Sequence, residues 1–263
     1  MMTLAAFHSE WVKLRRPTLL WGTFVGLALA ASMFAVLLFS QAQHGTRDQG
    51  GLPSLEELAQ PNGLIHGLSR AVILLGIVAF GVAASQVASE YSLGTLRQML
   101  VRQPRRLVFL LGKYLAVVSF LVAAVALAAV IAGVVAIGMA HVRGVPTSAW
   151  FSSTGVTDLT RALGDILLAV IGYATLGTVV GLFLRSSVAA VIVGFAYLLP
   201  VEAIITAIVH STSAWLPGEM LTDVAQGGTQ TVSYGHALGI SAVYLLVAAG
   251  AAALWFRRRD VTA

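Results

Sequence analysis

The distribution of charged residues limits what this chain can fold into more than any other feature. No Asp, Glu, Lys or Arg lies between Arg16 and Arg47, and five further stretches of similar length are nearly free of charge. A helix needs about 20 apolar residues to cross the hydrocarbon core of a membrane. Only 10% of the residues are charged, whereas a globular domain in water carries about 25%. The sequence therefore predicts an all-α polytopic membrane protein.

Six transmembrane helices are expected, one for each of these stretches. Pro200 and Glu202 lie inside the fifth, which we expect them to interrupt. The connections are short, and Ser54-Leu-Glu-Glu57 is typical of a capping box that opens a short helix before Pro61. We expect a single transmembrane domain over 1–263. The predicted spans are 18–40, 69–89, 113–140, 163–184, 188–209 and 235–256.

Basic residues predict the orientation. If the N-terminus is inside, twelve basic residues fall in cytoplasmic segments and four fall outside. Cytoplasmic loops carry an excess of Lys and Arg, so we expect both termini in the cytoplasm. The cations lie beside the spans, which favours membrane anchoring over binding of nucleic acid. The inner set is Lys13, Arg15, Arg16, Arg97, Arg102, Arg105, Arg106, Lys113, Arg185, Arg257, Arg258 and Arg259, and the outer set is Arg47, Arg70, Arg143 and Arg161.

Residues 3–16 have the periodicity of an amphipathic helix that precedes the first span. Its apolar positions recur at spacings of three and four residues. Such a helix can lie among the lipid headgroups, either as a simple anchor or as an element that a cytoplasmic partner pushes. The residues that we expect to define this interfacial helix are Phe7, Trp11, Lys13, Arg15 and Arg16.

A short helix is expected between the second and third spans, within 90–104. Gly94 can end the preceding helix, Thr95 can cap a new one and Pro104 ends it. Leu96 and Leu100, together with Met99, form an apolar face on this helix. A compact apolar face of this kind is suited to docking into a groove on another protein.

This segment resembles the permease subunit of ABC-2-type transporters. The residues that carry the resemblance are Glu90, Gly94, Thr95, Leu96, Leu100, Pro104, Arg106 and Lys113. One departure is that Arg106 follows Pro104 by two residues, where family members often have three.

The resemblance implies a coupling helix at 90–104, a connecting helix at 3–16 and a re-entrant hairpin at 210–234. It also implies two permease copies, as a homodimer or heterodimer, and a separate ABC ATPase subunit that binds ATP and Mg²⁺. The implied function is export of an amphipathic or hydrophobic substrate, such as a drug, antibiotic, peptide or lipid. By the same resemblance the chain itself holds no cofactor and lies in a bacterial cytoplasmic membrane, with lipid around it.

Absent motifs agree with this interpretation. The chain has no cysteine, and Gly112-Lys113 is followed by Tyr114, so no phosphate-binding loop is formed. We therefore expect a transport subunit without an enzymatic activity of its own. One alternative is a nucleotide-independent membrane protein, either a lipid-handling or a channel-like scaffold.

A second alternative is an intramembrane serine protease. Ser69 or Ser241 would be its nucleophile and His210 or His236 its base. Both serines lack the final glycine of the protease signature, and the scattered histidines have no metal-ligand spacing, so we expect no metal site.

Charges within spans are functional hypotheses because their burial in lipid costs at least about 2.5–3.5 kcal/mol each. Glu202 in the fifth span is a candidate for a structural partner, a gate contact or proton coupling. Arg70, at the external end of the second span, is a candidate to pair with it. Small residues such as Gly76, Gly177 and Gly181 allow close helix approach, within one subunit or between two.

Overall fold

Six helices among the described residues are long and apolar enough to span a membrane, which confirms the predicted number. The computed structural model describes residues 2–42, 53–92, 94–95 and 105–258. Five spans are single helices: α2 (Pro17–Gln41), α4 (Gly63–Ser92), α6 (Arg106–Val142), α7 (Ser153–Leu184) and α11 (Tyr234–Arg258). The remaining span, Ser187–Ile208, consists of α8 (Ser187–Ala196), a π-helical turn (Tyr197–Val201) and α9 (Glu202–Ile208).

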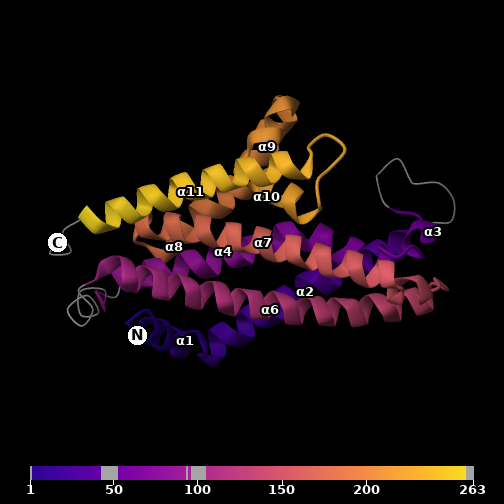
Figure 1. The fold of residues 1–263 in the computed structure, drawn as a ribbon, viewed down its shortest axis with the longest axis horizontal. Coiled ribbons are helices and arrows are strands. Elements are labelled where there is room, and N and C mark those ends of the chain that lie inside the picture. Colours follow the sequence, from indigo (N-terminus) through magenta and orange to yellow (C-terminus); the bar gives the residue numbers. More distant parts are fainter. Residues whose placement is uncertain (1, 43–52, 93, 96–104, 259–263) are drawn as a thin grey trace.

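The long helices run along the longest axis of the molecule, and both ends of the chain lie at the same end of the bundle (Figure 1). The shorter helices connect or flank them. These are α1 (Met2–Leu14), α3 (Leu55–Leu58), the 3-10 turn Ser148–Phe151, the 3-10 helix His210–Trp215 and α10 (Pro217–Ala225). No strand occurs in the part of the chain that the structure describes.

Helices α4 and α7 form the centre of the bundle and are the most buried of the spans. Their backbones approach closely because Gly177 lies against the Phe80 carbonyl and Gly181 against the Ala84 carbonyl. Any side chain at these two positions would collide with the facing helix. The small residues in these spans therefore pack helices within one subunit.

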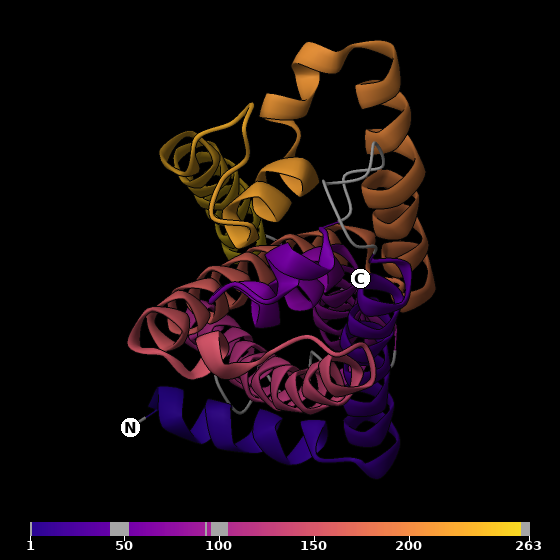
Figure 2. The same ribbon diagram turned by 90° about the vertical axis from the view of Figure 1, so that its right-hand side faces the viewer.

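The fifth span bends where the sequence predicts an interruption. Pro200 lies in the π-helical turn, and because proline has no N–H it cannot continue the helical hydrogen bonding. Helix α9 then leaves the bundle, and α10 returns to pack against α7 and α11 (Figure 2).

The connections at the end of the bundle opposite the termini are ordered by local contacts. Ser54 accepts a hydrogen bond from the Glu57 N–H at 3.1 Å and its own N–H donates to the Glu57 carboxylate at 3.3 Å, which confirms the predicted capping box. At the same end Trp150 is buried between the helices, and its indole N–H donates to the Leu58 carbonyl at 2.9 Å.

Candidate functional site

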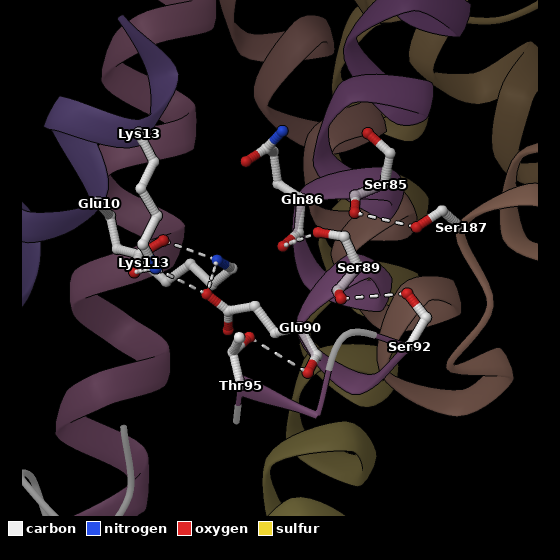
Figure 3. Close-up of polar contacts among 10 residues, drawn as sticks. All are labelled: Glu10, Lys13, Ser85, Gln86, Ser89, Glu90, Ser92, Thr95, Lys113 and Ser187. Carbon is white, nitrogen blue, oxygen red and sulfur yellow. Dashed lines mark hydrogen bonds and ion pairs between the residues drawn. The ribbon is translucent and has the colours of Figure 1, made fainter. Parts of the chain in front are cut away.

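Four charged side chains from three separate helices meet in one buried ion cluster. Glu10 and Lys13 come from α1, Glu90 from the last turns of α4, and Lys113 from the second turn of α6 (Figure 3). The Lys113 ammonium lies 2.7 Å from an oxygen of Glu10 and 2.7 Å from an oxygen of Glu90. Lys13 reaches the same two carboxylates at 2.5 and 3.0 Å. Two cations therefore share two anions.

The cluster is electrically balanced, which is the condition for burying charges at tolerable free energy. Lys113 is only 2% exposed and Glu10 3% exposed, whereas the Lys13 side chain is 29% exposed. Lys113 and Glu10 are thus fully desolvated, and each depends on the other for its charge to be compensated.

The ionisation of the α1 side chains reflects this balance. Burial raises the pKa of the Glu10 carboxyl, but the charge of Lys113 and the hydrogen bonds from both lysines outweigh it and bring the pKa below its usual value. Burial lowers the pKa of Lys13, yet the Glu10 hydrogen bond and the charges of Glu90 and Glu10 raise it above its usual value. Both side chains are held in their charged forms.

Helix α1 is fixed against α6 by apolar contacts beside the cluster. The ring of Trp11 stacks on Phe7 with centroids 5.6 Å apart and meets the edge of Phe120 in α6 at 6.5 Å. Leu14 is 1% exposed. The apolar face of α1 is therefore covered in part by protein.

The cations predicted for α1 have different surroundings. Lys13 turns to the ion cluster, whereas Arg15 and Arg16 are exposed just beyond the end of the helix. That α1 lies at a membrane interface stays a prediction.

The residues predicted to couple the chain to a partner begin directly after Glu90. Helix α4 ends at Ser92, and Gly94 has a left-handed φ of 66° with its N–H donating to the Tyr91 carbonyl at 3.1 Å. The Thr95 hydroxyl donates back to the Glu90 carbonyl at 3.5 Å. Leu96, Leu100 and Pro104 lie outside the described residues. Arg106 is half-buried at the first position of α6.

A polar cavity of about 420 Å³ adjoins the ion cluster. Glu90, Thr95 and Lys113 line it together with Ser89 and with Ser187 at the start of α8. The Ser187 hydroxyl donates to the Ser85 carbonyl of α4 at 3.4 Å (Figure 3). Hydroxyl and charged side chains form most of its lining.

A second polar site surrounds Glu202. Its carboxylate is 2% exposed and accepts hydrogen bonds from the N–H groups of Gly218 and Glu219, at 3.0 and 3.1 Å. It thereby caps the N-terminus of α10. The hydroxyl of Tyr173, from the middle of α7, donates to the Gly218 carbonyl at 2.9 Å.

Arg70 lies in another environment. It lines a cavity of about 300 Å³ together with Asp158, Arg161 and Asp165 of α7. Both Glu202 oxygens accept backbone hydrogen bonds, so the structural partner of this carboxylate is the N-terminus of α10. Its pairing with Arg70 stays a prediction, as does a role of either residue in a gate.

Two of the serine and histidine candidates for a protease have other surroundings than each other. The His236 ring lies 3.1 Å from the Ala214 carbonyl and against Trp215. The Ser241 hydroxyl is buried without a hydrogen-bond partner in the structure. Within the described residues, no group of three or more His, Asp or Glu side chains is placed to hold a metal ion.

Sequence reasoning missed Glu10 and Tyr173. Glu10 is the only acidic residue before the first span and precedes Lys13 by three residues, which places the two on one helix face. That signal could have identified it. Nothing local marks Tyr173, since its role depends on the return of α10 to the bundle.

Comparison with known proteins gives a family without an assigned activity. Residues 31–262 match the family described as "Protein of unknown function (DUF2705)", which covers more than four fifths of the chain. The chain belongs to this family. No curated protein matches it.

Proposed function

We propose that this chain is the permease subunit of an ATP-driven ABC exporter, acting as a dimer with a separate ATPase at the cytoplasmic face of a bacterial membrane. The observation that carries the proposal is the ion cluster of Glu10, Lys13, Glu90 and Lys113. It links the N-terminal helix, the end of α4 and the start of α6, and Glu90 is the first residue of the proposed coupling segment 90–104.

Such a linkage suits the transmission of force. In this proposal a movement of the residues after Thr95 is passed first to Glu90, because the Thr95 hydroxyl is hydrogen-bonded to the Glu90 carbonyl. Glu90 shares Lys113 with Glu10, so α1 and α6 are drawn along with α4. The buried charges have no alternative partners in solvent, so separating them costs more than moving the helices together.

The orientation in this proposal places both termini, the ion cluster and segment 90–104 in the cytoplasm. The basic residues beside the spans support it, and so does the location of both chain ends at one end of the bundle (Figure 1). Segment 210–234 then lies outside, with α10 entering the bundle as a re-entrant helix beside Tyr173.

The chemical nature of the bundle supports an amphipathic or hydrophobic substrate. The polar cavities lie at the two ends, and the surfaces between them are apolar. ATP and Mg²⁺ are bound by the ATPase in this proposal, because the sequence contains no phosphate-binding loop.

The test is affinity purification from the native host in mild detergent, scored for a stoichiometric ATP-hydrolysing partner. We expect the wild type to retain an ATPase, and the double variant Leu96→Asp/Leu100→Asp to lose it while still inserting into the membrane. The matched control is Val142→Asp, exposed at the opposite end of the bundle where α6 ends, and we expect it to retain the ATPase. A wild-type chain that purifies without any ATPase overturns the proposal and favours the nucleotide-independent scaffold. An ATPase that the Leu96/Leu100 variant retains overturns the assignment of the coupling segment.

A further inference from the structure

An apolar groove of about 590 Å³ lies between α6, α7 and α11. Its floor is formed by α7, and its sides by Leu111 of α6 and by Leu246 and Ala249 of α11. The volume falls in the range of pockets that hold small ligands, about 300–1,000 Å³. The groove stays open because several of its α11 positions are alanines, and larger side chains at these positions would fill it.

The groove offers a ligand almost no polar group, although its lining includes three hydroxyl-bearing residues. The hydroxyl groups in its lining are all engaged within the protein. Tyr114 and Thr175 hydrogen-bond to each other at 2.7 Å, and Thr178 donates to the Ala174 carbonyl at 2.8 Å. A ligand in the groove therefore meets hydrocarbon surface and no free polar group, which fits an acyl chain better than a polar substrate.

The length of the groove matches one membrane leaflet. Its α11 lining runs from Ala242 to Ala253, which at 1.5 Å per residue is about 16 Å. Half of a hydrocarbon core of about 30 Å is about 15 Å. The groove is therefore long enough for an acyl chain to lie along one leaflet.

Beyond one end of the groove, the residues that flank α6 and α11 are basic. Phe109 of α6 and Phe256 of α11 pack in one apolar cluster with Leu182, so the start of α6 and the end of α11 meet there. The first brings Arg105 and Arg106 and the second brings Arg257 and Arg258, while the described lining residues include no carboxylate. In the proposed orientation this end faces the inner leaflet, whose anionic headgroups attract such clusters.

We propose that this groove binds an anionic glycerophospholipid from the inner leaflet, with one acyl chain between α6, α7 and α11 and the phosphate on the arginines. The inference rests on the membrane orientation given above, but it requires neither an ATPase partner nor a transport activity.

The test uses the purified full chain in detergent and counts bound lipid by native mass spectrometry. The probes are phosphatidylglycerol and phosphatidylcholine with identical acyl chains. We expect the wild type to bind phosphatidylglycerol more tightly. In Arg257→Gln/Arg258→Gln we expect this preference to fall about 25-fold, because each cation near an anionic headgroup contributes about fivefold. The matched control Arg15→Gln/Arg16→Gln removes the same charge from the α1–α2 connection.

A second pair of variants tests the groove itself. Ala249→Phe fills the space and is expected to reduce binding of both lipids, whereas Val247→Phe, on the lipid-facing side of the same helix, is expected to leave binding unchanged. Equal affinity of the wild type for the two lipids overturns the proposal. So does lipid binding that Ala249→Phe leaves intact. A dimer that Ala249→Phe converts to a monomer would show that a second copy occupies the groove.

Discussion

Charge compensation decides which individual residues this fold depends on. Lys113 and Glu10 are nearly inaccessible to solvent, and each is compensated only inside the ion cluster. Removing one partner of a buried pair leaves an uncompensated charge, which is far more costly than losing an exposed pair. We therefore expect substitutions within the cluster to differ in how much they lower the stability of the protein.

Glu10→Gln is expected to destabilise the protein by about 3–5 kcal/mol, because Lys113, which is only 2% exposed, loses half of its compensation. Lys13→Gln is the matched control, since it removes a charge from the same cluster at a half-exposed position, and we expect a loss of about 1 kcal/mol or less. Thermal unfolding in detergent measures both. Equal losses would contradict the unequal burial on which the prediction depends.

Asp223 on α10 predicts a pH dependence of stability. Burial, with a contribution from Glu219, raises the pKa of the Asp223 carboxyl to about 6. A carboxyl whose pKa is raised in the folded state binds a proton more readily there than in the unfolded chain, so this group makes the protein less stable as pH rises toward 6. We expect Asp223→Asn to raise the unfolding temperature above pH 6, and the difference from wild type to shrink as pH falls toward 4.

The matched measurement for Asp223 uses Asp158→Asn, which removes a carboxylate near the start of α7. Unfolding temperatures of both variants between pH 4 and pH 8 provide the comparison. A pH profile for Asp223→Asn that runs parallel to that of the wild type would show that this carboxyl is not responsible.

At the residue scale, the sequence predicted the positions that local chemistry determines. The capping box at Ser54 follows from residue types and spacing alone. Glu202 could be recognised as an unusual charge in a span, but its partners could not. They are backbone N–H groups of Gly218 and Glu219, which no side-chain pattern reveals.

At the scale of helices, the ends of the predicted hydrophobic spans differ from the ends of the helices. The second span is predicted at 69–89, but α4 extends over Gly63–Ser92, and the third is predicted at 113–140, but α6 extends over Arg106–Val142. Charges end a hydrophobic stretch without ending the hydrogen bonding of a helix. The helices therefore continue past the predicted ends by up to ten residues, as in α7, which begins at Ser153 rather than 163.

The contact between α4 and α7 makes a prediction of its own. Gly181→Val would place a side chain on the Ala84 carbonyl, where the facing helix is rigid backbone. We expect a loss of about 1–3 kcal/mol, as for other overpacked cores. Gly250→Val in α11 is the control, because a side chain at that position meets open space. Unfolding temperatures of the two variants should differ by several degrees, and a tolerated Gly181→Val would contradict the close approach.

The cap of α10 predicts a local change in flexibility. In Glu202→Gln the side chain keeps its shape but can accept only one of the two backbone hydrogen bonds, and the favourable interaction of a negative charge with the helix N-terminus is lost. We expect faster hydrogen–deuterium exchange in peptides that cover 216–226, with unchanged exchange in α4. Glu57→Gln, which preserves the capping box of α3, is the control. Unchanged exchange at 216–226 would contradict a role of the Glu202 cap in ordering α10.

At the scale of the whole molecule, the two ends of the bundle differ in kind. The end that carries both termini holds the ion cluster and most of the cations. The opposite end holds the capped loop at Ser54, the buried Trp150 and the mixed-charge cavity around Arg70 and Asp165. The even number of spans places both termini on the same side, and the difference between the two ends favours one orientation in the membrane. The proposed function requires such a fixed orientation.

The direction can be measured because the sequence contains no cysteine, so a single introduced thiol is the only one present. Ser148→Cys and Ser211→Cys lie on the end proposed to be external, and His8→Cys and Arg258→Cys on the end proposed to be cytoplasmic; all four positions are exposed. We expect a membrane-impermeant maleimide to label the first pair in intact cells and the second pair only after the membrane is permeabilised. Labelling of His8→Cys in intact cells would show that the orientation in the membrane is the reverse of the one proposed. The ion cluster would then face the exterior, where no ATP-hydrolysing subunit could reach it, and the permease assignment would fail together with the orientation.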